Sequence, residues 1–141
     1  MTRSLAWSWA VVAAAVGAGA GCATSLESQG TLPVAVTIEA VPHATAGVVV
    51  ISATLRNLTT EDLTLRVRCT PIELEMDQNG TWTRIEDFRS CAPPDRTTLR
   101  AGQVADVEDQ RALGPGRYRV VIESIDGRAA YSESFTVAPQ S

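Results

Sequence analysis

Most of the chain alternates between apolar and polar residues with a period of two, as β-strands with one buried face do. In residues 63–69 the odd positions are apolar and the even ones polar, which predicts that Cys69 faces the core. After residue 22 no convincing helical periodicity occurs. The alternation predicts strands over residues 34–41, 47–56, 63–69, 72–77, 81–85, 97–99, 104–109, 117–124 and 130–137.

Turn residues separate these runs at short intervals. Asn79 and Gly80 lie between two alternating runs, and both tolerate the positive φ of a tight hairpin. A Gly/Pro turn at residues 113–116 precedes Tyr118, which either returns its hydroxyl to the backbone as a tyrosine corner or simply fills the core. We therefore expect an all-β, immunoglobulin-like antiparallel β-sandwich of about seven to nine strands.

Four short segments recur in the same order in bacterial immunoglobulin-like domains. They are residues 57–59, 77–82, 99–102 and 113–118, all of which combine turn and core positions. Over residues 34–137 the chain thus resembles these domains and, distantly, the intracellular proteinase inhibitor family of bacilli. The resemblance implies the fold, and no inhibitory residue of that family can be carried over. An envelope proteinase-inhibitor-like module is therefore the alternative function.

The N-terminus has the pattern of an export signal. Arg3 precedes an apolar run that ends in small residues directly before Cys22. This predicts a lipoprotein signal peptide over residues 1–21 and a lipid on Cys22, although Gly19 stands where a branched apolar residue is usual. One alternative is an ordinary signal peptide that leaves Cys22 as a free thiol. The other is an anchoring helix, which needs about 20 apolar residues.

The rest of the chain then divides into two parts. Residues 22–33 form a lipidated N-terminus and tether, and residues 34–138 form the sandwich domain. Ala23 follows the cysteine in place of the Asp that retains lipoproteins at the inner membrane, so the outer membrane is favoured in a host that has one. We expect contact with the membrane through the lipid, and an envelope protein as partner.

Charge and cysteine content narrow the functional classes. The net charge is −4 and every basic residue is an arginine. An acidic chain without a basic stripe is not expected to bind nucleic acid. Once Cys22 carries lipid, Cys69 and Cys91 are left to form a disulfide in an oxidising compartment, which stabilises the fold by roughly 3 kcal/mol.

Catalytic and metal-binding motifs are weak. His43 is the single histidine and no nucleophile motif accompanies it, so we predict neither an enzyme nor a cofactor. Glu75, Asp77, Asn79 and Glu86 follow the spacing of an EF-hand calcium loop. The flanking residues are strand-like and the Asn-Gly pair is explained by a hairpin, so no metal is predicted there.

Two further features concern the surface. Trp82 and Arg84 form a candidate contact patch on the predicted hairpin, because Trp and Arg are enriched in interfaces; the alternative is a Trp82 that covers the core. The acidic residues of 106–109 are expected to form a charged strand edge that prevents aggregation. Together these patterns predict a lipid-anchored envelope protein that acts as a binding or structural module.

Overall fold

The computed structural model describes residues 30–87, 89–92 and 95–140, and within these ranges all regular structure is β. The predicted signal peptide and Cys22 lie outside the described residues. The strands are β1 (Val34–Pro42), β2 (Val48–Asn57), β3 (Leu63–Arg66), β4 (Glu73–Gln78), β5 (Thr81–Arg84), β6 (Arg96–Leu99), β7 (Val104–Ala112), β8 (Gly116–Glu123), β9 (Ala129–Tyr131) and β10 (Phe135–Val137).

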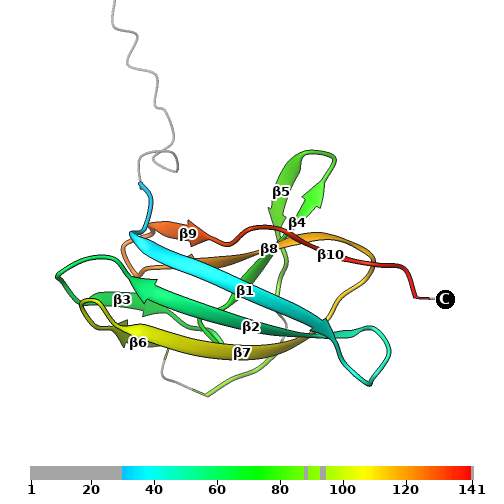
Figure 1. Ribbon diagram of the computed structural model, residues 1–141, viewed down its shortest axis with the longest axis horizontal. Helices are drawn as coiled ribbons and strands as arrows, with labels where there is room; N and C mark the ends of the chain where they lie inside the picture. Colours follow the sequence, from blue (N-terminus) through cyan, green and yellow to red (C-terminus); the bar gives the residue numbers. More distant parts are fainter. Residues whose placement is uncertain (1–29, 88, 93–94, 141) are drawn as a thin grey trace, which may run out of the picture.

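These strands form three antiparallel sheets (Figure 1). One has the order β1-β2-β7, and the second has the order β10-β8-β4-β5 with β9 also paired to β8. The third is a two-stranded ribbon of β3 and β6. All three sheets contribute to one cluster of buried side chains, represented by Ile51 on β2, Leu65 on β3, Leu99 on β6, Leu74 on β4 and Val120 on β8. The predicted all-β, antiparallel class is confirmed.

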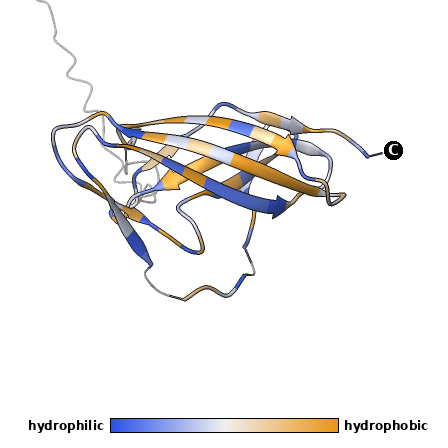
Figure 2. Ribbon diagram, turned by 60° about the horizontal axis from the view of Figure 1, so that its bottom comes forward, coloured by the Kyte–Doolittle hydropathy of each residue, from blue (hydrophilic) through white to orange (hydrophobic). Residues whose placement is uncertain are grey.

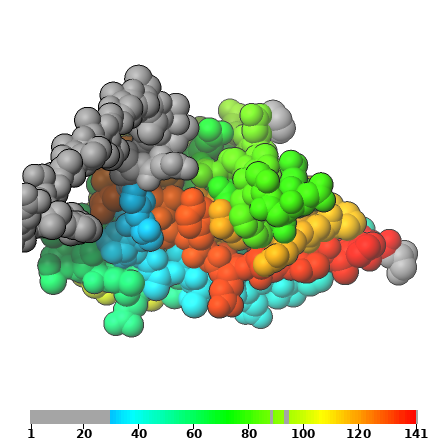
Figure 3. Space-filling model, turned by 90° about the horizontal axis from the view of Figure 1, so that it is seen from above, coloured from blue at the N-terminus to red at the C-terminus, as the bar shows by residue number. Residues whose placement is uncertain are grey.

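The hairpin predicted at Asn79-Gly80 joins β4 to β5. Asn79 has φ 56° and Gly80 has φ 88°, the left-handed conformations that a two-residue hairpin turn requires. The Gly80 N–H donates to Asp77 Oδ1 at 2.7 Å, which closes the turn. The hairpin stands out from the rest of the molecule beside β8, as Figures 1 and 3 show.

Tyr118 closes the corner between β7 and β8. Its hydroxyl donates to the Gly114 carbonyl at 2.7 Å, while its ring is buried and stacks on Phe135. Burial raises the pKa of the Tyr118 hydroxyl, so it stays protonated and able to donate. Tyr118 therefore combines the two roles weighed from the sequence.

A buried asparagine fixes the end of β2. The Asn57 side-chain nitrogen donates to the carbonyls of Glu61, Leu99 and Arg100, and its side-chain oxygen accepts from the Thr59 N–H. These bonds hold the loop after β2 against the turn between β6 and β7. They thereby fix the end of β6, which pairs with β3 and not with β7, the strand that follows it in the chain.

Several predicted boundaries differ from the structure. β3 ends at Arg66, because the chain then turns toward Pro71, and Cys69 is half-buried instead of facing the core. The last predicted strand is split into β9 and β10, because Ser132 Oγ accepts the Val120 N–H at 2.9 Å where a strand carbonyl would otherwise do so. The folded part also begins before Val34, since Leu32 is only 1% exposed and belongs to the core.

Candidate functional site

The five-stranded sheet carries its polar side chains on the face away from the core. On β8, Tyr118 and Val120 are buried, whereas the alternating residues Arg117 and Arg119 are not. The register places Trp82 on β5 opposite Asp77 on β4. It also places Glu75 on β4 beside Arg119 on β8. Strand alternation and register therefore bring residues that are distant in sequence together on this face.

Two arginines and two aromatic rings lie together on this face, where Arg117 and Tyr131 are exposed and Arg119 and Trp82 are half-buried. The Arg119 guanidinium carbon lies 4.5 Å from the centroid of the Trp82 ring and 4.0 Å from that of Tyr131. The guanidinium carbon of Arg117 lies 5.5 Å from the Trp82 ring. These are cation–π distances, and we refer to Trp82, Arg117, Arg119 and Tyr131 as the Trp82 cluster.

The Trp82 cluster is held in place yet accessible. The Arg119 Nη2 atom is 2.6 Å from Glu75 Oε2, which fixes the guanidinium between the two rings. Arg117 lies 3.5 Å from Asp77 Oδ2 and also donates to Ser134 Oγ. Tyr131 remains 46% exposed and the Arg117 side chain 57% exposed. The ion pairs already hold these aromatic and guanidinium groups in one arrangement. Little side-chain conformational entropy would therefore be lost if another molecule bound to them.

Arg84 lies two positions from Trp82 on β5 and therefore on the same face of the hairpin. The guanidinium groups described over the Trp82 ring belong to Arg117 and Arg119. Arg84 instead forms an ion pair with Glu73, and its Nη1 lies 3.4 Å from Glu123 Oε2. Trp82 thus belongs to the Trp82 cluster, whereas Arg84 belongs to a neighbouring ion-pair network.

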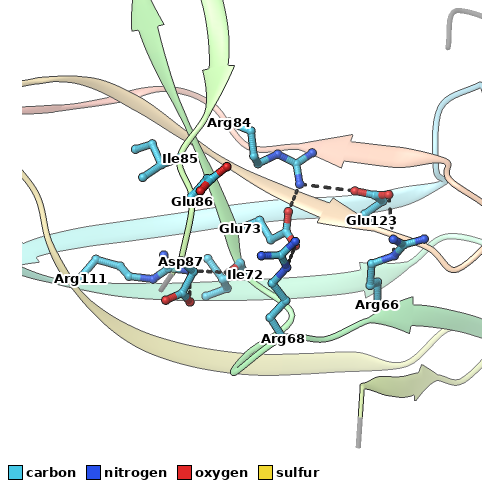
Figure 4. Close-up of a pocket in the computed structure, with 10 residues that line it drawn as sticks. All are labelled: Arg66, Arg68, Ile72, Glu73, Arg84, Ile85, Glu86, Asp87, Arg111 and Glu123. Carbon is cyan, nitrogen blue, oxygen red and sulfur yellow. Dashed lines mark hydrogen bonds and ion pairs between the residues drawn. The ribbon is translucent and has the colours of Figure 1, made fainter. Parts of the chain in front are cut away.

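That network lines a cavity of about 360 Å³ between the β4–β5 hairpin and β3. Figure 4 shows Glu73 between Arg68 and Arg84, with Glu123 between Arg84 and Arg66. The Arg68–Glu73 and Arg66–Glu123 distances are 3.6 Å and 3.8 Å. Glu73 and Glu123 each lie beside two arginines, so the negative charges on this part of the cavity wall are neutralised by neighbouring positive charges.

The residues with EF-hand spacing do not converge on a common point. Glu75 is engaged by Arg119, and Asp77 accepts the Gly80 N–H within the turn. Asn79 is a turn residue, and Glu86 lies beyond β5 at the wall of the cavity. In the part of the chain that the structure describes, no group of three or more His, Cys, Asp or Glu side chains is arranged to hold a metal ion.

A buried charge cluster was not expected from the sequence. Asp109 is on β7 and its side chain is only 3% exposed, which corrects its assignment to an exposed acidic edge. Its oxygens accept from Arg111 Nε at 2.7 Å and Arg89 Nη1 at 2.8 Å, while Arg89 also reaches Asp87 at 2.6 Å. Arg111 Nη2 donates to the Ile72 carbonyl at 3.0 Å. We call Asp87, Arg89, Asp109 and Arg111 the Asp109 cluster.

These contacts favour the ionised carboxylates. A hydrogen bond from Arg89 lowers the pKa of Asp87 to about 2. Burial by itself raises the pKa of Asp109, but hydrogen bonds from Arg89 and Arg111 outweigh this effect, and its pKa is lowered. The period of two in residues 104–112 is the signal that would have placed Asp109 and Arg111 on the inner side of β7.

The Asp109 cluster and a disulfide hold the same loop. Cys69 and Cys91 form a disulfide, with Cα atoms 5.3 Å apart and a separation of 22 positions in sequence. Arg89 is close to Cys91 in the chain and binds Asp109 on β7. The segment between β5 and β6 is therefore fixed at two points, one covalent and one ionic.

Comparison with known proteins gives no family. No family model matches the chain, and no curated protein matches it. Northeast Structural Genomics Consortium target SoR45 is 14% identical over 74% of this chain and 84% of that chain, with a TM-score of 0.42. A Bordetella pertussis protein described as ApaA is 16% identical over 75% of this chain and 91% of that chain, with a TM-score of 0.41. Function is therefore inferred from the chain's own residues.

The search for membrane-spanning helices is negative for the described ranges. No helix there is long and apolar enough to cross a bilayer.

Proposed function

We propose that this chain is a lipid-anchored protein of the cell envelope that binds another envelope component through the Trp82 cluster. The observation that carries the proposal is the ordered stack in which Arg119 lies between the rings of Trp82 and Tyr131 on one face of the five-stranded sheet, with Tyr131 exposed and Trp82 half-buried. Trp, Tyr and Arg are the residues most enriched at the energetic centres of protein interfaces. Here they form one patch that the protein's own core does not require.

The proposed domain is an immunoglobulin-like β-sandwich. Side chains of the β1-β2-β7 sheet and of the β10-β8-β4-β5 sheet belong to the same buried cluster, which supports packing of the two sheets face to face. The hydrogen bond from Tyr118 to Gly114, at the start of β8, has the form of a tyrosine corner. Such domains are commonly binding or structural modules, which is consistent with a role in binding another molecule and not in catalysis.

Two independent features support export of the chain. The N-terminal sequence ends its apolar run at Cys22, as lipoprotein precursors do. The Cys69–Cys91 disulfide requires an oxidising compartment to persist. A lipid at Cys22 would leave a short segment before Leu32, so the domain would sit close to the membrane with the Trp82 cluster available to a neighbouring protein.

Replacing Trp82 by alanine tests the binding role. We expect the full-length protein, purified from its native envelope after mild crosslinking, to retain a specific partner that Trp82→Ala loses by at least about tenfold, since hot-spot residues contribute about 2 kcal/mol or more. Leu58→Ala is the matched control, because Leu58 is a large apolar side chain that is 61% exposed on a different part of the surface. Equal recovery by Trp82→Ala and the native protein, at equal thermal stability, contradicts the proposal.

A further inference from the structure

We propose a second interaction surface: the open edge of β7, with the apolar cavity beside it, accepts an extended segment of another protein in which apolar and basic residues alternate. β7 pairs with β2 along one side. On its other side the described residues provide no paired strand, because β6, which precedes β7 across a short turn, pairs with β3 instead. β7 is also the most hydrophilic strand of its sheet (Figure 2).

The backbone of β7 offers free hydrogen-bonding groups along this edge. Asn57 donates to the Gln103 carbonyl and Leu113 donates to that of Gly47, so the odd-numbered residues of β7 bond to β2. The N–H and C=O groups of Asp106 and Glu108 therefore point away from β2. The Gln110 N–H is already taken by Asp109 Oδ1 at 2.9 Å, which limits the open stretch to Val104–Glu108.

An apolar cavity of about 330 Å³ lies beside this stretch. Its walls include Ala105 and Val107 from the inner side of β7, together with Leu65 and Leu99 from the β3–β6 ribbon. A strand added to β7 would direct every second side chain to the side of Ala105 and Val107. These side chains would enter the cavity, so backbone pairing and apolar burial would act together, as in other cases of strand addition.

The negative charges on the outer side of β7 favour a basic segment over a second copy of this chain. On the outer side of the open stretch, Asp106 accepts a hydrogen bond from Thr54, and neither Asp106 nor Glu108 has an ion-pair partner among the described residues. A second copy of this chain pairing through β7 would bring these acidic residues opposite one another, which is destabilising. A segment with Arg or Lys at its outward positions would instead place a positive charge next to each carboxylate.

Short capped peptides test this proposal on the full-length protein. In each peptide valine alternates with one second residue, which is arginine, glutamine or glutamate. By fluorescence anisotropy we expect affinity to fall in that order, and N-methylation of alternate amides in the arginine peptide to abolish binding. The Glu108→Pro variant removes an outward N–H without touching the bonds to β2, and should weaken the arginine peptide by about tenfold or more. The Glu108→Gln variant keeps the N–H. It should still bind the peptides, and should lose only the preference for an arginine over a glutamine at the peptide position next to residue 108.

Three results would overturn the proposal. One is failure of the native protein to bind the arginine peptide, and another is unchanged binding by a folded Glu108→Pro variant. The third is a dimer of the native protein that Glu108→Pro dissociates, because it would assign the edge to a second copy. If Glu108→Pro does not fold, the N-methylated peptide applies the same test to the native protein, and equal binding of the two peptides contradicts strand addition.

Discussion

Replacing Asp109 by asparagine is expected to lower the free energy of unfolding by about 3 kcal/mol, because the buried Arg111 loses its nearest carboxylate and keeps only Asp87, at 3.4 Å. The Arg111 side chain is only 10% exposed, and Asp109 is its nearest carboxylate, at 2.7 Å. Urea unfolding monitored by tryptophan fluorescence measures the loss. Asp106→Asn is the control on the same strand, since Asp106 is exposed and its replacement should change stability by about 0.5 kcal/mol or less.

The effect of Asp109→Asn can also be measured as a change in how the free energy of unfolding depends on pH. Both Asp87 and Asp109 have lowered pKa values in the folded protein, that of Asp87 to about 2. Their stabilisation is therefore complete above the pKa of an unfolded aspartate, about 3.9, and is lost as the pH falls toward 2. The native protein should lose stability over this window more steeply than Asp109→Asn. Parallel curves would show that the Asp109 cluster does not stabilise the fold.

Removing the disulfide is the second large effect. The double variant Cys69→Ser/Cys91→Ser should be destabilised by roughly 3 kcal/mol, because the unfolded chain regains the freedom of the loop that the bond closes. The native protein under reducing conditions should unfold at the same urea concentration as the oxidised double variant. A double variant as stable as the oxidised native protein would mean that the Asp109 cluster alone fixes this loop.

The features that the sequence predicts correctly depend on few neighbouring residues. The hairpin at Asn79-Gly80 forms because both residues accept positive φ, whatever the rest of the chain does. The bond from Tyr118 to Gly114 likewise spans a single turn. Alternation is also a local property, which is why most strands lie near their predicted positions.

The features that the sequence did not reveal depend on long-range register. Trp82 contacts Arg117 and Arg119 because β4 lies between β5 and β8, an order that no local pattern specifies. Asp109 and Arg89 meet across 20 residues of sequence, so their pairing requires knowledge of the path between β5 and β6. The pairing of β3 with β6 is of the same kind, and it is what leaves the edge of β7 open.

The proposed function depends on lipid attachment at Cys22, and metabolic labelling in the native host with an alkyne analogue of palmitate tests this attachment most directly. We expect the native protein to carry the label, the Cys22→Ser variant to lack it, and the Cys91→Ser variant to keep it. Globomycin should cause the native protein to accumulate with its signal peptide attached. An unlabelled native protein whose processing is insensitive to globomycin, or a Cys22→Ser variant that still carries the label, would contradict the account.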